Sequence, residues 1–251
     1  MINNDDIVLI TGASRGIGAA TARLFAKNNY KICINYRNDS DSASSLANEI
    51  KQSGGQCITV QADVSVEDEV IRLFETVDQE LGTLSVLVNN AGVLRKQSRL
   101  DAMTAERINH LLTSNVTSQF LCCREAVKRM STKYHGRGGN IINISSGASR
   151  TGSPNEYTDY AATKGAIDTL TIGLSKEVAA EKIRVNCVRP GLIYTDMHAD
   201  GGEADRVERL KSKIPMQRGG NPAEVAEAIY WLGSDKSSFT TGSFIDVTGG
   251  L

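Results

Sequence analysis

Short apolar runs alternate with longer amphipathic segments along the whole chain. The runs have the length of buried strands, and they occupy residues 7–10, 31–36, 57–61, 84–89, 140–146, 183–188 and 244–247. Apolar residues recur at helical spacing after Ala19 and Thr104 and over residues 42–53, 65–80, 118–134, 160–178 and 222–232. This alternation predicts an α/β protein in which one doubly wound, seven-stranded parallel sheet, flanked by helices, takes up residues 1–251.

The first strand runs directly into a glycine-rich turn, and a helical pattern begins after it. This order is the context of a dinucleotide-binding (Rossmann) fingerprint, although the glycines follow the spacing G-x-x-x-G-x-G rather than G-x-G-x-x-G. A glycine permits the sharp turn, and two more let the backbone approach a pyrophosphate at the helix N-terminus. We expect the cofactor to contact Gly12, Ser14, Arg15, Gly16, Ile17 and Gly18. The alternative is a tight turn that binds nothing.

The second predicted strand ends in an arginine rather than an acidic residue. In this fold an acidic residue at that place binds the ribose 2′-hydroxyl, whereas an arginine accommodates a 2′-phosphate. Arg37 follows the strand directly, and Arg15 lies in the glycine turn. Two guanidinium groups near one corner suit a phosphate dianion. The sequence therefore predicts NADP (NADPH) rather than NAD as cofactor, the alternative being two solvated surface arginines.

Polar residues also follow the third and fourth strands. Asp63, next to Val64, either binds the adenine amino group or caps the following helix, and the sequence favours neither. The run Asn89-Asn90-Ala91-Gly92 suits the close approach of a ligand, or forms an Asx-Gly turn. Asn115 lies between two helical stretches, where it either caps the second helix or is a functional amide at a helix irregularity.

Tyr160 and Lys164 are four residues apart at the start of a predicted helix and therefore share a face. A free phenol has a pKa of about 10, and a nearby ammonium group favours the phenolate. Tyr160 is thus a candidate general acid in reduction and general base in oxidation. Ser146, at the end of the fifth strand, offers a hydroxyl to a carbonyl oxygen that gains charge as hydride arrives. A serine nucleophile is disfavoured, because neither a histidine nor a G-x-S-x-G turn accompanies it.

Composition narrows the function further. The net charge is −1, and the chain has neither a basic stripe nor an aromatic platform for nucleic acid. The five cysteines lie in apolar segments without metal-ligand spacing, so we expect reduced, buried thiols and no metal site. No basic leader or membrane-length apolar run is present, which favours a cytoplasmic protein without membrane contact. The polar segment 192–219 is a candidate substrate lid.

The chain resembles the short-chain dehydrogenase/reductase family along essentially its whole length. The residues that carry the resemblance, in order, are Thr11-Gly12-Ala13-Ser14-Arg15-Gly16-Ile17-Gly18, Asp63-Val64, Asn89-Asn90-Ala91-Gly92, Asn115, Ser146, Tyr160-x-x-x-Lys164 and Pro190-Gly191. The run 152–166 looks like that of glucose-dehydrogenase-like oxidoreductases. The interval from Ser146 to Tyr160 is slightly longer than in 3-oxoacyl-(acyl-carrier-protein) reductases, which argues against an acyl-carrier substrate.

The resemblance implies a role for each matching residue. Ser146 orients the carbonyl, Tyr160 transfers the proton, and Lys164 lowers the pKa of the tyrosine and holds the nicotinamide ribose. Ser145 competes for the serine role, but matching Gly152 to the family pattern favours Ser146. Asn115 positions a water in a proton relay. The remaining cofactor contacts are implied for Asp63 and Val64 beside the adenine, for Asn89, Ala91 and Gly92 along the cofactor, and for Pro190, Gly191, Ile193 and Thr195 near the nicotinamide.

The sequence therefore predicts an NADP-dependent oxidoreductase that interconverts a small ketone or aldehyde with its alcohol. One alternative is an NAD(P)-dependent sugar dehydrogenase of the glucose type. Another is a non-catalytic dinucleotide-binding sensor, although such a protein has no need of a proton donor at Tyr160. The resemblance also implies a homotetramer that packs through residues 222–232 and 244–247, whose apolar residues would serve equally as ordinary core.

Overall fold

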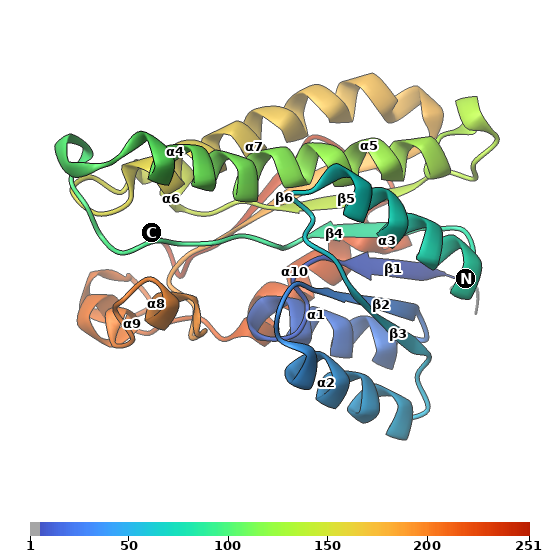
Figure 1. Ribbon diagram of the computed structural model, residues 1–251, viewed down its shortest axis with the longest axis horizontal. Helices are drawn as coiled ribbons and strands as arrows, with labels where there is room; N and C mark the ends of the chain where they lie inside the picture. The colour runs from blue at the N-terminus through green and yellow to red at the C-terminus, as the bar shows by residue number, and fades with distance from the viewer. Residues whose placement is uncertain (1–5) are drawn as a thin grey trace.

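A computed structural model describes residues 6–251 of the chain (Figure 1). Residues 1–5 lie outside this range, so the structure does not bear on the prediction made from the first residues of the sequence. The strands of the sheet are β1 (Ile7–Ile10), β2 (Lys31–Tyr36), β3 (Cys57–Gln61), β4 (Val86–Asn89), β5 (Gly139–Ile144), β6 (Ile183–Pro190) and β7 (Phe244–Val247). All neighbouring strands are parallel, in the order β3-β2-β1-β4-β5-β6-β7. The predicted doubly wound α/β fold is confirmed.

Helices cover both faces of this sheet. They are α1 (Gly16–Lys27), α2 (Ser40–Gln52), α3 (Glu67–Glu80), α4 (Ala105–Leu112), α5 (Ser118–Met130), α6 (Ala148–Thr151), α7 (Thr158–Val178), α8 (Met197–Asp200), α9 (Arg206–Leu210) and α10 (Pro222–Gly233). Helices α1, α2 and α10 lie on one face, and α3, α5 and α7 on the other (Figure 1). The short helices α8 and α9 lie beyond the carboxyl end of the sheet.

Two apolar cores follow from the strand geometry. Successive side chains of a strand point to opposite faces, so a strand buried on both sides must be apolar throughout. In β1, Val8 and Ile10 enter the core under α1 and α10, whereas Ile7 and Leu9 enter the core under α3 and α5. All four side chains are buried. Packing from both faces fixes the register of β1, and with it the position of the glycine turn that follows.

The sheet order places the candidate site. The chain winds outward from β1 to β3, returns across the sheet to β4, and then continues outward in the other direction. The two strands next to each other at this reversal are β1 and β4. Ligands of open α/β sheets bind outside the carboxyl ends of the strands at such a switch point. The glycine turn follows β1, and Asn89-Asn90-Ala91-Gly92 ends β4, so both lie at this edge.

Several predicted elements differ from the structure by one or two residues at their ends, and three segments show differences with an identifiable polar contact. The helix predicted over residues 118–134 ends at Met130, because Ser131 is extended and its hydroxyl accepts a hydrogen bond from Lys133 N at 3.0 Å. The run 147–159, predicted as a loop, contains α6, whose first turn is closed by a bond from Ala148 N to Ser146 Oγ at 3.1 Å. The helix predicted from residue 65 begins at Glu67. Hydrogen bonds from short polar side chains lie at each of these places, Ser131, Ser146 and the Asp63–Ser65 turn, and the spacing of apolar residues does not reveal them.

Candidate active site

A cavity of about 680 Å³ opens at the carboxyl ends of the strands. Its walls bring together residues from β5, α7, the segment after β6 and the start of α1, which are far apart in the sequence. Among the predicted site residues, those that line it are Ile17, Ser146, Tyr160, Lys164, Pro190, Gly191, Ile193 and Thr195. Much of the remaining wall is apolar, with Leu94, Pro154, Tyr157, Met197 and Leu210. The cavity therefore has the mixed lining of a small-molecule site.

Tyr160 and Ser146 both line the wall of the cavity. Ser146 lies two residues after the end of β5, where its Oγ accepts a hydrogen bond from Ala148 N, and Tyr160 lies in the first turn of α7. Burial raises the pKa of Tyr160 to about 12, and the neighbouring Ser146 hydroxyl opposes this rise. Tyr160 is therefore a neutral phenol at neutral pH and has a proton to donate. The pKa of Tyr160 is thus raised, whereas the Tyr–Lys spacing predicts a lowered value.

The position of Lys164 explains that difference. Its side chain is 3% exposed, and Nζ lies 5.6 Å from the centre of the Tyr160 ring while donating a hydrogen bond to Ile144 O at 2.8 Å. Burial lowers the pKa of Lys164 to about 8, although Cys187 and Asp168 oppose the fall. The ammonium group is thus bound to the end of β5 rather than to the phenol oxygen. Of the two serines there, Ser145 points the other way and donates to Lys164 O at 3.1 Å.

Asn115 lies in a single π-helical turn, Thr113–Thr117, between α4 and α5. Its side chain is fully buried, accepts from Val93 N at 2.8 Å and donates to Val93 O at 3.0 Å. A helix cap is therefore wrong, and the alternative of a functional amide at a helix irregularity agrees with this geometry. Gly92 sits so close that a Cβ there would lie 3.5 Å from both Asn115 Oδ1 and Lys164 Nζ. The loop after β4 thus lies between the side chains of Asn115 and Lys164.

The glycine turn is built for close approach to a ligand. Gly12 and Gly16 have φ of +59° and +57°, and a Cβ on Gly18 would lie 2.7 Å from Gly12 O and Asn90 Nδ2. No side chain caps the N-terminus of α1, and its first turn holds no acidic residue. The backbone amides there are left for an anion, which favours a phosphate group. These features fit the pyrophosphate of a dinucleotide, with Ser14 and Arg15 in the same turn.

Of the two asparagines at the end of β4, the structure places the second at the site. Asn90 lines the cavity and closes the glycine turn by donating to Thr11 O and Gly12 O, both at 2.9 Å. Asn89 is 1% exposed and donates to Asn143 Oδ1 at 3.0 Å. Its side chain therefore points into the core beneath the site, and the expected contact along the cofactor shifts to Asn90. The pair of asparagines at residues 89–90 indicates in the sequence that an amide lies at this strand end. It does not indicate which of the two side chains faces the cavity.

The adenosine corner pairs its arginine with an aspartate. Asp63 Oδ1 accepts from Ser65 N at 2.9 Å and from Ser65 Oγ at 2.6 Å, so it caps the turn that leads into α3. Its other oxygen lies 3.6 Å from Arg37 Nη1. Burial opposes ionisation, but the bonds from Ser65 and the charge of Arg37 hold the pKa of Asp63 below its usual value. Val64 packs in the core under α3. Arg37 is half-exposed at this corner.

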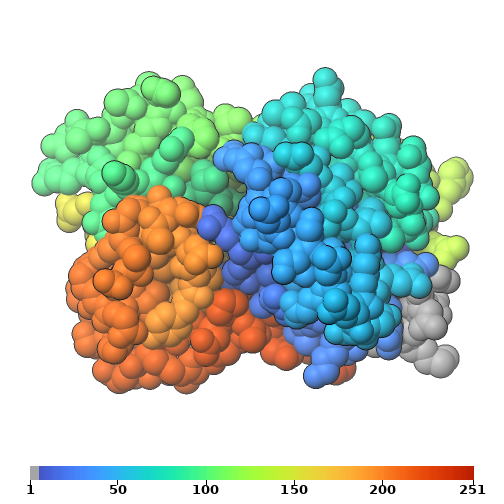
Figure 2. Space-filling view, turned by 60° about the horizontal axis from the view of Figure 1, so that its bottom comes forward, coloured from blue at the N-terminus to red at the C-terminus, as the bar shows by residue number. Residues whose placement is uncertain are grey.

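The segment 192–219, which contains α8 and α9, forms part of the cavity wall. Arg15 of the glycine turn forms an ion pair with Asp200 and lies 3.8 Å from Asp196. In Figure 2 this segment, in orange, lies against the blue N-terminal part of the chain. On another side, Arg206 is paired with Glu156 and stacks 4.8 Å from the centre of the Tyr157 ring. These ion pairs join the segment to the glycine turn and to the loop before α7.

Cys33, Cys57, Cys122, Cys123 and Cys187 are free and buried, as the sequence predicts. Over residues 6–251, no group of three or more His, Cys, Asp or Glu side chains is arranged to hold a metal ion. Within the same range, no helix has the length and apolar character needed to cross a membrane.

Comparison with known proteins gives matches over nearly the whole chain. Residues 12–251 match the family described as Enoyl-(Acyl carrier protein) reductase. The chain is 60% identical over 244 residues to the uncharacterized oxidoreductase YgfF of Escherichia coli, covering 97% of this chain and 99% of that one. Identity is 35% over 243 residues to glucose 1-dehydrogenase 2 of Bacillus subtilis and to 3-oxoacyl-(acyl-carrier-protein) reductase FabG of Staphylococcus aureus. These matches cover 97% of this chain and 93% and 96% of the relatives.

A solved structure is similar as well. A mutant of a Serratia marcescens short-chain dehydrogenase/reductase superimposes with a TM-score of 0.89 at 29% identity. The match covers 98% of this chain and 97% of the other. The shared fold therefore extends over nearly the whole chain, from the glycine turn to the C-terminal strand.

Proposed function

The chain belongs to the short-chain dehydrogenase/reductase family, and we propose that it is an NADP(H)-dependent oxidoreductase that interconverts a small ketone or aldehyde with its alcohol. Family membership makes it an oxidoreductase that uses a nicotinamide dinucleotide. The observation that carries the proposal is the meeting of Ser146, Tyr160 and Lys164 in the wall of one cavity, with Lys164 one helical turn after Tyr160.

Each of the three side chains has a task in reduction. Ser146 and Tyr160 both offer hydroxyl groups to a carbonyl oxygen in the cavity, which stabilises the negative charge that develops on it. The bound nicotinamide supplies the hydride. Tyr160 gives its proton to the oxygen, a contribution worth about 10²–10⁴ in rate. Lys164, as ammonium, stabilises the phenolate left behind and offers a donor to the cofactor ribose.

The preference for NADP rests on charge at the adenosine corner. No acidic residue ends β2, where one would bind the ribose 2′-hydroxyl. Arg37 follows the strand and Arg15 lies in the glycine turn, so both guanidinium groups are on elements that border the predicted phosphate position. Each is half-exposed, with 47% and 49% of its side chain accessible. Both can therefore exchange an aspartate partner for a phosphate without moving the backbone.

Two other functions fit less well. A sugar dehydrogenase working toward oxidation is favoured by the 35% identity to glucose 1-dehydrogenase 2. Oxidation needs a phenolate as base, however, whereas Tyr160, whose pKa burial raises to about 12, is at neutral pH in the protonated form that reduction requires. A non-catalytic dinucleotide sensor would not need the Tyr160–Ser146 pair.

The setting of the enzyme is part of the proposal. We infer a cytoplasmic protein whose segment 192–219 is a substrate lid and which acts on small molecules rather than on nucleic acid. We also infer a homotetramer that uses α10 and β7. Trp231 on α10 is 39% exposed, which leaves apolar surface for a neighbouring subunit. Light scattering that finds a monomer at micromolar concentration would contradict the tetramer.

Cofactor binding tests the proposal first. The purified protein is titrated with NADPH and with NADH in parallel, following nicotinamide fluorescence. Tighter binding of NADPH supports the role of Arg15 and Arg37, and NADPH consumption is then followed with a panel of small ketones and aldehydes. Preference for NADH contradicts the cofactor assignment and favours the sugar dehydrogenase. Binding of neither contradicts the proposed function.

A further inference from the structure

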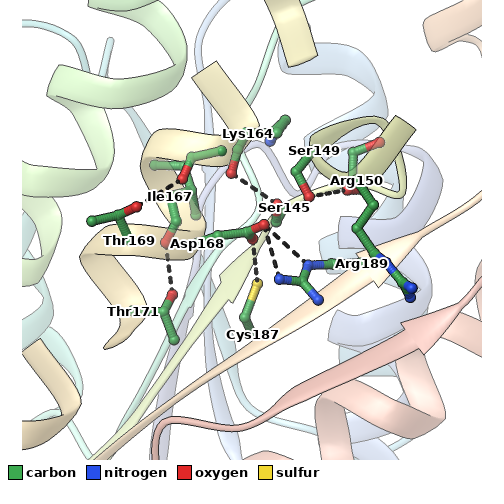
Figure 3. Close-up of polar contacts among 12 residues, drawn as sticks. Ser145, Ser149, Arg150, Lys164, Ile167, Asp168, Thr169, Thr171, Cys187 and Arg189 are labelled. Atoms are coloured by element: carbon green, nitrogen blue, oxygen red, sulfur yellow. Dashed lines mark hydrogen bonds and ion pairs between the residues drawn. The ribbon is translucent and has the colours of Figure 1, made fainter. Parts of the chain in front are cut away.

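A partly buried ion pair lies one helical turn beyond Lys164, outside the set of residues that the proposed reaction uses. Asp168 is on the same face of α7 as Lys164, and its Oδ2 accepts hydrogen bonds from Arg189 Nε at 3.1 Å and Nη2 at 2.9 Å. The side chains are 14% and 16% exposed. Figure 3 shows the pair beside Ser145 and Lys164, with the Cys187 thiol directed at the same carboxylate. Such a pair needs its geometry fixed, because neither charge is solvated well.

The surroundings hold Arg189 in place. Its guanidinium lies 4.0 Å from the centre of the Phe244 ring, and Nη1 is 3.5 Å from Asp246 Oδ1. Asp246 also pairs with Arg150, which lines the substrate cavity four residues after Ser146. Charges of alternating sign therefore run from α7 through β6 and β7 to α6. Of these four charged residues, Asp168 lies next to Lys164.

Lys164 needs a negative charge nearby, because its site is otherwise unfavourable for an ammonium group. The groups that face it are Tyr160 and Asp168 from α7, Cys187 from β6, Ile144 O from β5, and Gly92 with Asn115 from the opposite wall. Burial raises the pKa of Cys187 to about 12, so that thiol is neutral when Lys164 titrates. Cys187 and Asp168 both oppose the lowering of the Lys164 pKa by burial, and of these two Asp168 is then the one that carries a charge.

We propose that Asp168 is a positioning residue for the reaction: held by Arg189, it keeps Lys164 in the ammonium form that acts on Tyr160. This role rests on the proposed function of Lys164. It also explains why a partly buried carboxylate and guanidinium are paired one helical turn from Lys164. Two more bonds, from Lys164 Nζ to Ile144 O and from Ser145 Oγ to Lys164 O, tie the same turn of α7 to β5.

The direct test reads the protonation of Lys164 without any substrate. Lysine labelled with carbon-13 at Cε is incorporated, and the Lys164 signal is assigned by its loss in Lys164→Arg and followed against pH by NMR. Asp168→Asn is expected to lower the pKa of Lys164 by about one pH unit, as loss of a neighbouring opposite charge does. Asp168→Glu is expected to restore most of the wild-type value.

Arg189→Gln separates charge from packing. It breaks the same ion pair but removes a positive charge, so the pKa of Lys164 is expected to stay or to rise. Asp78→Asn, which breaks the 2.7 Å pair with Arg129 between α3 and α5, serves as control and should leave Lys164 unchanged. The proposal is overturned if Asp168→Asn leaves the Lys164 titration in place, or if Arg189→Gln lowers it equally.

Activity provides the second readout. With a carbonyl compound that the wild type reduces, the alkaline limb of the pH–rate profile should move to lower pH in Asp168→Asn and not in Arg189→Gln. If the wild type reduces no carbonyl, the proposed function fails, while the NMR titration still decides the role of Asp168. If the wild type is active but the limb does not move with the Lys164 titration, the positioning role is wrong and the function stands.

Discussion

Lys164 Nζ donates a 2.8 Å hydrogen bond to Ile144 O, the last carbonyl of β5. The strand that delivers Ser146 to the cavity and the helix that carries Tyr160 are thereby joined through the side chain between them. The bond also holds the ammonium group at the end of β5, 5.6 Å from the centre of the Tyr160 ring. Burial then dominates at Tyr160 and raises its pKa to about 12. The resting site is consequently set for proton donation.

The pH dependence of reduction follows from these two groups. Burial lowers the pKa of Lys164 to about 8, with Cys187 and Asp168 opposing, so the ammonium form is complete below that pH and is lost as the pH rises through it. Tyr160 remains protonated throughout this range. We predict that kcat/KM for carbonyl reduction is level at neutral pH and falls above about pH 8. A rate that rises through this range would contradict the assignment of Lys164.

Cofactor choice should depend on Arg37. Arg37→Asp removes the cation at the end of β2 and places there the kind of side chain that binds a 2′-hydroxyl. We predict that NADPH binding weakens at least about tenfold more than NADH binding, since a charge-assisted pair is lost and a repulsion is added. Arg23→Asp is the matched control, because Arg23 is equally exposed but pairs with Glu49 away from the site. Equal losses for both cofactors in Arg37→Asp would show that the 2′-phosphate is bound elsewhere.

The ion pair between Arg15 and Asp200 should compete with the cofactor. A phosphate that binds Arg15 must replace the carboxylate of Asp200. Asp200→Asn is therefore predicted to tighten NADPH binding by a few-fold, which corresponds to the small free energy of an exposed ion pair. The effect should shrink at high salt. Asp205→Asn changes the charge of the same segment without touching Arg15, and it should leave NADPH affinity unchanged. Unaltered affinity in Asp200→Asn would show that Arg15 is not used by the phosphate.

Residues close to one another in sequence were the predictable part of this molecule. Each strand is an apolar run because both faces of the sheet are covered, and the spacing of Tyr160 and Lys164 puts them on one helix face whatever the tertiary structure. The glycine turn is read in the same way, since its strand and helix are contiguous with it. For these reasons the sheet, its helices and the catalytic pair could all be derived from local patterns.

Relationships across the fold could not be read from such patterns. Asn89 and Asn90 point to opposite sides of one strand end, and only the packing of α5 decides which enters the core. Arg15 and Asp200 are 185 residues apart. Asp168 looks like an ordinary polar helix position until β6 brings Arg189 beside it. The pKa of Tyr160 likewise depends on burial that its sequence neighbours do not reveal.

Tyr160→Phe tests the central claim most directly, because it removes one hydroxyl group and little else. The measurement is NADPH consumption with a carbonyl compound that the wild type reduces, together with fluorescence titration of NADPH for both proteins. The account predicts that turnover falls by about 10²–10⁴ while the dissociation constant of NADPH stays within a few-fold of the wild type. Wild-type turnover in Tyr160→Phe would contradict the assignment of Tyr160 as the proton donor, and with it the proposed mechanism.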